Sequence, residues 1–137
     1  MRSFLDTNVL VYADAADEPI RQGVAIELIR RHRKDATGVI STQVLQEFAN
    51  VALRKLHLPP PLIRQRLAFY QGFEVVPATP QLITAALDLH VLHSLSLYDA
   101  LIIRAAEVAA CQALLSEDLQ HGFSFAGVKV VNPFRTG

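Results

Sequence analysis

Residues 3–10 read Ser-Phe-Leu-Asp-Thr-Asn-Val-Leu, and the interpretation of the fold starts from this stretch. A short apolar run ends at Asp6, and Thr7 and Asn8 lead directly into a second apolar run. This order predicts a buried strand, a tight turn and the start of a helix. Open parallel α/β sheets bind ligands at the carboxyl ends of their strands, where a carboxylate favours a hard cation. The alternative is that Asp6 or Thr7 only caps the helix.

Size and composition predict one globular domain over residues 1–137. Because 51% of the residues are hydrophobic and 19% are charged, the chain is expected to have a packed core rather than to be disordered. The 13 basic and 13 acidic residues cancel. Any binding of a polyanion must therefore come from local patches and not from the net charge.

Cysteine content and hydropathy point to a soluble protein of a reducing compartment. Cys111 has no second cysteine to pair with, and its apolar surroundings predict a small core residue. Asp6 and Asp14 interrupt the early apolar run, which argues against a signal peptide. The longest charge-free run, residues 75–87, is too short to span a bilayer. We expect a cytoplasmic protein with no membrane partner.

Apolar runs and helical patterns alternate along the chain. Strands are predicted at residues 3–5, 38–41, 73–76, 113–115 and 128–131. Helices are predicted between them; Thr42 is expected to cap one, Thr79-Pro80 to begin another, and the Gly-rich segment 122–127 to form a loop. The alternation indicates an α/β fold with a mainly parallel central sheet of about five strands, covered by helices on both faces.

Two more acids stand where they could join Asp6. Asp118 follows the fourth predicted strand, as Asp6 follows the first, although an ordinary turn aspartate is the alternative. Glu117 beside it is expected to be exposed. Glu47 lies at the edge of the apolar arc of its helix, and its alternative is a half-buried glutamate that extends to solvent.

Asp99 is the most informative acid. It precedes Ile102, Ile103 and Ala106 at helical spacing, so it shares their apolar face and is predicted to point inward. An unpaired charge there is costly. Ser96 lies three residues earlier, and a capping box explains why an acid is tolerated in the first turn. Capping does not explain why the acid lies within the apolar arc.

Convergence of these acids at one edge of the sheet predicts a metal. Several carboxylates a few ångströms apart repel one another and raise each other's pKa values. A divalent cation removes this conflict, and Mg²⁺ prefers oxygen ligands of this kind.

Four segments and the chain ending resemble a known family. Residues 4–10, residues 41–48 with Glu47-Phe48, residues 97–102 and residues 115–119 resemble the PIN-domain ribonucleases, and the ending Val-Val-Asn-Pro-Phe at 130–134 is most similar to the VapC-type toxins of bacterial toxin–antitoxin pairs. The resemblance implies a Rossmann-like α/β/α sandwich and RNA cleavage that depends on Mg²⁺ or Mn²⁺. It also implies an antitoxin that blocks the site, and a homodimer.

The same resemblance assigns roles to individual residues. The acidic quartet maps onto Asp6, Glu47, Asp99 and Asp118. We expect Asp6 and Asp99 to bind the ion directly, and Glu47 and Asp118 to hold its water, help deprotonate it or complete a second ion site. The side chains expected to orient the carboxylates and water are Thr7, Asn8 and Ser116.

Other functions remain open at this point. A metal-dependent phosphatase or other hydrolase and a non-catalytic interaction module are alternatives on a similar fold. A phospho-receiver domain would need a late lysine, and Lys129 lies within the last predicted strand. His90 and His93 are favoured as structural or surface residues over metal ligands, and His121 is given no role. Candidates for phosphate contact, most of them expected on solvated helix faces, are Arg30, Arg31, Arg33, Lys34, Arg54, Lys55, Arg64 and Arg66.

Overall fold

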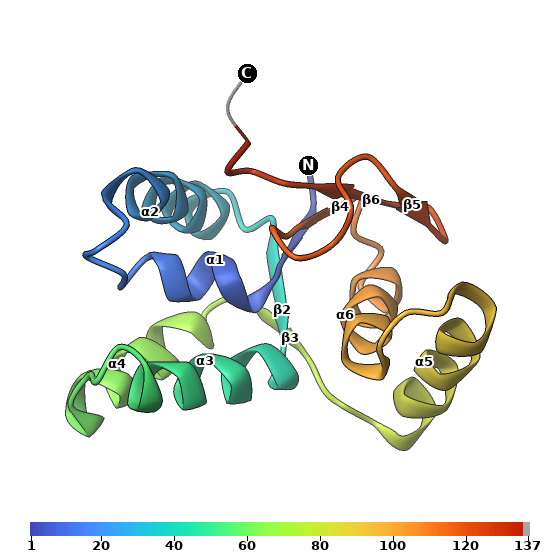
Figure 1. Ribbon diagram of the computed structural model, residues 1–137, viewed down its shortest axis with the longest axis horizontal. Helices are drawn as coiled ribbons and strands as arrows, with labels where there is room; N and C mark the ends of the chain where they lie inside the picture. The colour runs from blue at the N-terminus through green and yellow to red at the C-terminus, as the bar shows by residue number, and fades with distance from the viewer. Residues whose placement is uncertain (136–137) are drawn as a thin grey trace.

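The computed structural model describes residues 1–135 and contains one six-stranded sheet. The strands lie in the order β3-β2-β1-β4-β6-β5, and all neighbouring pairs are parallel except β5 with β6 (Figure 1). Their bounds are β1 Ser3–Leu5, β2 Gly38–Ser41, β3 Glu74–Val76, β4 Ala113–Leu115, β5 Ser124–Phe125 and β6 Val128–Val131. The predicted α/β fold with a mainly parallel sheet is confirmed, and residues 136–137 lie outside the described part of the chain.

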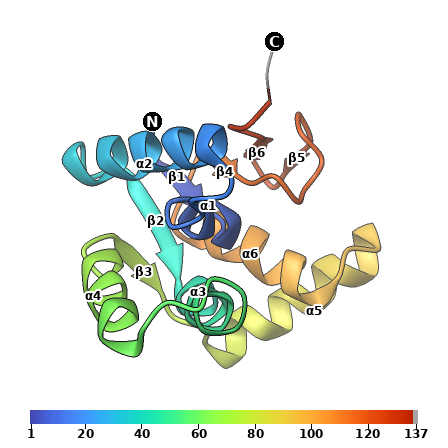
Figure 2. The same cartoon turned by 60° about the vertical axis from the view of Figure 1, so that its left-hand side comes forward.

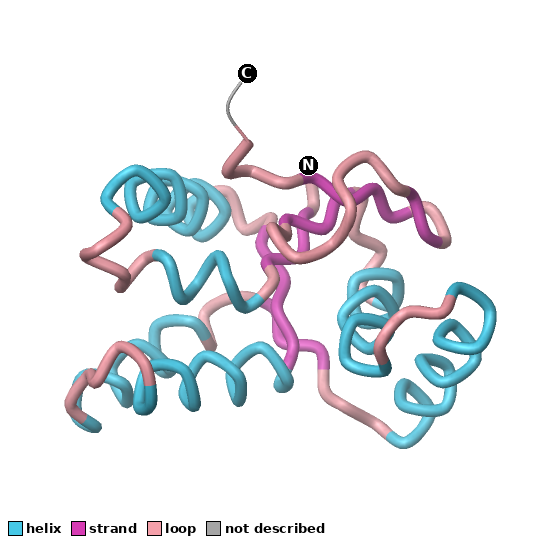
Figure 3. Tube along the Cα trace, in the orientation of Figure 1, coloured by secondary structure: helices cyan, strands magenta, loops and turns pink. Residues whose placement is uncertain are grey.

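Helices cover the sheet on both sides. They are α1 Thr7–Tyr12, α2 Pro19–Lys34, α3 Thr42–Arg54, α4 Pro60–Tyr70, α5 Pro80–His93 and α6 Leu97–Val108. Figures 1 and 3 show α1 to α4 on one side of the strands and α5 with α6 on the other. Pro80 begins α5 after Thr79, whose hydroxyl accepts a hydrogen bond from the Leu82 amide at 3.1 Å, as the sequence predicted.

The order in which strands are added to the sheet switches sides between β1 and β4, although these two strands are parallel. The order β1, β2, β3 runs outward to one edge, and the chain then returns to place β4 on the other side of β1. Such a switch point leaves a crevice outside the carboxyl ends of the two strands, where doubly wound sheets bind ligands. β1 and β4 are fully buried, so the polar residues that follow them emerge from the centre of the molecule.

Two local predictions are corrected. Ser41, not Thr42, is the N-cap of α3, because Ser41 is still extended and its hydroxyl accepts from the Val44 amide at 3.3 Å. The Gly-rich loop 122–127 contains β5, which makes a sixth strand. β5 forms because Ala126 and Gly127 both have positive φ, as a two-residue hairpin turn of type I′ requires.

No single helix in residues 1–135 is long and apolar enough to cross a membrane. The pair α5 and α6 reaches the necessary length and composition only when both are counted, and the two are bent by 116° relative to each other. Cys111 is buried as expected, and burial raises the pKa of its thiol to about 11.

Candidate metal centre

Asp6 lies at the carboxyl end of β1 and is only 6% exposed. It is the N-cap of α1: its Oδ1 accepts from the Thr7 amide at 2.7 Å, so the capping alternative describes one of its contacts. Its other oxygen, Oδ2, accepts from the Ser116 hydroxyl at 2.7 Å. The carboxylate is therefore held both by the start of α1 and by the segment after β4.

The pKa of the Asp6 carboxyl is raised to about 6, chiefly by burial. The hydrogen bonds from Ser116 and Thr7 lower it, and the negative charges of Asp118 and Glu47 raise it again. Burial and two like charges thus outweigh two hydrogen bonds. A cation beside Asp6 would reverse this balance, because opposite charge favours the ionised form.

Asp118 is joined to Asp6 through Ser116. The fully buried Ser116 hydroxyl, which donates to Asp6, accepts from the Asp118 amide at 3.1 Å. Asn8 holds the same segment, since its Nδ2 donates to Asp118 Oδ2 at 3.1 Å and its Oδ1 accepts from the Glu117 amide at 3.3 Å. Asn8 and Ser116 thus hydrogen-bond to the carboxylates of Asp118 and Asp6, and their orienting role toward a metal stays a prediction.

Glu47 reaches the same place from α3. Its Oε1 accepts from the Thr7 hydroxyl at 3.0 Å and from Gln43 Nε2 at 3.1 Å. Gln43 is buried and also donates to the Tyr98 carbonyl at 3.3 Å, which ties α3 to the start of α6. Gln43 was not predicted; the available signal was its position one turn before Glu47 on the same helix face.

Asp99 lies at the rim of this cluster. It is half-buried in the first turn of α6, where the Ser96 hydroxyl accepts from its amide at 3.1 Å, as the capping prediction required. Within residues 1–135 its carboxylate accepts no hydrogen bond and is not among the charges that shift the pKa of Asp6. The structure thus joins Asp6, Glu47 and Asp118 in one network and leaves Asp99 on the neighbouring helix end.

The residues present fit a hydrated hard cation better than a closed protein cage. Among the described residues, no three His, Cys, Asp or Glu side chains already stand as a ready ligand set. Mg²⁺ does not need one, because it keeps several waters and takes one or two carboxylates directly. The side chains that meet here offer carboxylate, hydroxyl and amide oxygens, and the buried Asp6 carboxylate could bind such an ion directly.

Glu117 was expected to be exposed and is instead held by side chains of distant segments. Tyr12 donates its hydroxyl to Glu117 Oε1, and Arg21 Nε donates to Glu117 Oε2 at 2.8 Å. Burial opposes ionisation of Glu117, but these hydrogen bonds leave its pKa lowered. This contact fixes the segment that carries Asp118.

The other titratable side chains that the sequence raised lie elsewhere. His90 Nδ1 contacts the Leu95 carbonyl, the His93 ring packs edge-on against Phe125, and His121 Nδ1 accepts from the Asn132 amide. Lys129 is exposed in β6. None of these contacts involves the acidic cluster.

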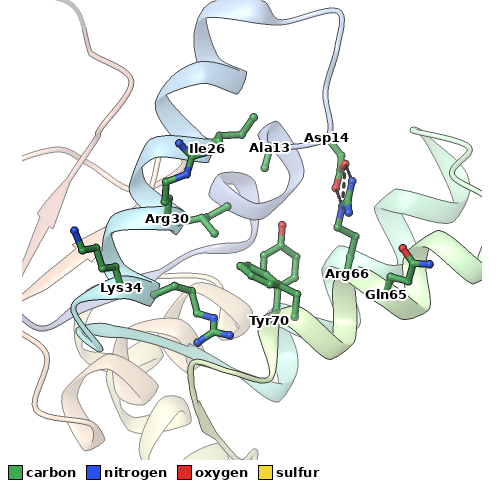
Figure 4. A pocket seen from close by; sticks show the side chains of 11 residues that line it. Ala13, Asp14, Ile26, Arg30, Lys34, Gln65, Arg66 and Tyr70 are labelled. Carbon is green, nitrogen blue, oxygen red and sulfur yellow. Dashed lines mark hydrogen bonds and ion pairs between the residues drawn. The ribbon is translucent and has the colours of Figure 1, made fainter.

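Several candidate phosphate-contacting residues surround a separate cavity of about 820 Å³ between α2 and α4 (Figure 4). Arg30 and Lys34 line it from α2, and Arg66 lines it from α4, where it forms a two-pronged ion pair with Asp14. The cavity contains none of the four acids. Four basic side chains, Arg30, Arg33, Lys34 and Arg66, thus line a cavity separate from the acids, while Arg21 contacts Glu117 beside Asp118.

Comparison with known proteins identifies the family and the fold. No curated protein matched the sequence. A chain in a toxin–antitoxin complex from Klebsiella pneumoniae superposes with a TM-score of 0.69 at 20% identity, covering 96% of this chain and 97% of that one. VapC20 of Mycobacterium tuberculosis, a toxin that cleaves the sarcin–ricin loop, superposes with a TM-score of 0.63 at 20% identity, covering 85% and 89%. The PIN domain family model matches residues 3–124, and the chain therefore belongs to the PIN-domain family.

Proposed function

We propose that this protein is a metal-dependent endoribonuclease and the toxin of a toxin–antitoxin pair. The observation that carries the proposal is the buried Asp6 carboxylate at the switch point, linked to Asp118 through Ser116 and to Glu47 through Thr7. Membership of the PIN family supports a nuclease. The two neighbours, one in a toxin–antitoxin complex and one that cleaves RNA, support the toxin assignment.

Each of the four acids has a separate proposed role in phosphodiester hydrolysis. Bound Mg²⁺ or Mn²⁺ would supply charge relief on the phosphate and acidify the attacking water. Asp6 would hold the ion, and Asp99 on α6 would be the second direct ligand. Glu47 and Asp118 would orient the attacking water and accept its proton.

The contacts of Thr7, Asn8 and Ser116 keep these carboxylates in place. Each donates a side-chain hydrogen bond to one acid: Thr7 to Glu47, Asn8 to Asp118 and Ser116 to Asp6. Groups that orient metal ligands in this way tune both affinity and activity.

The toxin assignment implies two protein partners. An antitoxin would occupy or cover the acidic site and suppress cleavage, and a second copy of the chain would form a homodimer. Cleavage measured during titration of the purified toxin with its antitoxin tests the inhibition. The mass of the toxin alone in solution tests the homodimer.

The activity is tested by incubating purified protein with total RNA, with Mg²⁺ or with chelator, and mapping the cut ends. We expect cleavage only with the metal, and loss of cleavage by at least about a hundredfold in Asp6→Asn and in Asp99→Asn. Asp88→Asn, an exposed acid on α5, is the matched control and should cleave normally. Full activity in either pure site variant contradicts the assignment. Phosphate release from a small ester without RNA cleavage would favour a phosphatase.

A further inference from the structure

An open groove of about 280 Å³ lies directly beside the acidic cluster. One wall is a stripe along α3, and the other is the first turn of α6. The lining residues are Gln43, Gln46, Glu47, Asn50 and Tyr98. Positions 43, 46, 47 and 50 are three, four and seven apart and therefore share one helix face. Glu47 belongs both to this groove and to the acidic cluster.

Gln43 joins the two walls. Its side chain is 8% exposed, and its Nε2 donates both to Glu47 on α3 and to the Tyr98 carbonyl on α6. A buried amide with two acceptors is held in a single orientation, because releasing either bond would leave a buried polar group unpaired. The groove therefore has a defined width although its walls are far apart in sequence.

The groove offers an aromatic ring and exposed amides. Tyr98 is 66% exposed, and Gln46 and Asn50 are exposed one turn apart. An amide side chain carries both donors and an acceptor, so a pair of them can hydrogen-bond to the edge of a planar heterocycle. An exposed ring can stack on the face of the same heterocycle.

The charges in the groove select against a phosphate. Its lining contains no lysine or arginine, and its one ionisable acid is Glu47. Phosphate contacts depend largely on cationic side chains, and four of these, Arg30, Arg33, Lys34 and Arg66, line the separate cavity between α2 and α4. A ligand of this groove is thus neutral, planar and rich in hydrogen-bonding groups.

We propose that the groove between α3 and α6 binds one unpaired nucleobase of the RNA substrate, with Tyr98 stacking on its face and Gln46 and Asn50 contacting its edge. This inference rests on the proposed function. Because Glu47 lines the groove, the bound base lies next to the phosphate that is cut. The groove therefore selects the nucleotide adjacent to the cleavage site.

Binding without cleavage tests the proposal independently of catalysis. Fluorescence anisotropy is measured in chelator with short single-stranded RNA homopolymers of each base and with an abasic oligomer of equal length. We expect Tyr98→Ala to weaken binding of the favoured homopolymer about tenfold and Tyr98→Phe to retain affinity within about twofold, since stacking needs only the ring. Gln112→Ala, an exposed amide just before β4 and at the opposite end of that strand from Ser116, is the control and should leave affinity unchanged.

The amide residues have a different expected readout. Gln46→Ala and Asn50→Ala should reduce the difference in affinity between homopolymers, and with Mg²⁺ they should broaden the distribution of bases at mapped cut ends. The proposal is overturned if the abasic oligomer binds as well as the homopolymers, or if Tyr98→Ala behaves like Gln112→Ala. If the wild-type protein binds RNA in a base-dependent way but does not cleave it, the nuclease assignment is contradicted, while base binding in the groove is supported.

Discussion

On the β1–β4 side of the acidic site, the Asp6 carboxylate accepts a hydrogen bond from Ser116 and the Asp118 carboxylate accepts one from Asn8. On the α6 side, Ser96 bonds only to the backbone amide of Asp99, whose carboxylate accepts no hydrogen bond within residues 1–135. The first side is preorganised: its acids are fixed before any ion arrives, and burial already raises the pKa of Asp6. The second side contributes a half-buried carboxylate on the end of a helix. Figure 2 shows α1 near the centre of the view and the α5–α6 pair extending to the lower right.

The difference indicates how the site tolerates its own repulsion. Neighbouring carboxylates repel one another and destabilise the folded protein in the absence of a cation. The fold limits this repulsion because only some of the acids are held in fixed positions. In the proposed function, Asp99 completes the set from a neighbouring element. The fixed side, formed by Asp6, Asp118 and the side chains of Asn8 and Ser116, should therefore affect both ion affinity and the stability of the fold, whereas Asp99 should affect ion binding and cleavage with little effect on stability.

Removing the supports of the fixed side has the largest expected effect among changes outside the acids. Asn8→Ala and Ser116→Ala each remove a hydrogen bond that orients Asp118 or Asp6. We expect a loss of about 10- to 100-fold in cleavage and in Mn²⁺ affinity measured by calorimetry. Ser124→Ala, an exposed serine in β5, serves as the control. Unchanged Mn²⁺ affinity in both variants would show that the network does not position the ligands.

A change of pH tests the charge of the fixed side. The pKa of Asp6 is about 6, so below that pH the carboxyl is protonated in the metal-free protein and a proton competes with the ion. We expect Mn²⁺ affinity to fall about tenfold between pH 7 and pH 5. The fall should be less steep in Asp6→Asn, because this variant has no carboxyl at position 6 at which a proton competes with the ion. An affinity independent of pH over this range would exclude Asp6 as a ligand.

Much of the frame was predictable because it depends on local patterns. Apolar runs such as residues 113–115 and the Thr79-Pro80 start lie where the sequence placed them. Asp6 and Asp118 were identifiable because the end of a parallel strand has a known position in such a sheet. The two local errors concern features too short for a pattern to define. The missed strand β5 has two residues, too few to show a periodicity, and the predicted N-cap Thr42 lies one position after the observed N-cap, Ser41.

The long-range polar contacts were not predictable. Glu117 was expected to be exposed because its partners, Tyr12 and Arg21, lie about a hundred positions earlier in the chain. Gln43 resembles any polar residue on a helix until its two acceptors, on different elements, are known. Pairing between distant polar groups depends on the assembled fold, and a local pattern carries no signal for it.

The smallest effect concerns stability and separates the two sides most directly. A raised carboxyl pKa means that the folded state binds the Asp6 proton more tightly than the unfolded state, whose value is near 3.8, so this group lowers stability as pH rises from about 4 to about 6. Asp6→Asn removes the buried charge and retains a good helix cap. We expect the free energy of unfolding of metal-free protein near pH 7.5 to rise by about 1 kcal/mol.

Asp99→Asn should change the same quantity by less than about 0.5 kcal/mol, since the half-buried Asp99 carboxylate lacks hydrogen bonds within residues 1–135. Urea denaturation in chelator measures both variants, and the gain from Asp6→Asn should shrink toward zero near pH 4, where the folded wild type carries the proton. A destabilised Asp6→Asn at neutral pH would mean that the bonds from Thr7 and Ser116 outweigh burial. The fixed side would then stabilise the metal-free protein, rather than destabilise it until a cation binds.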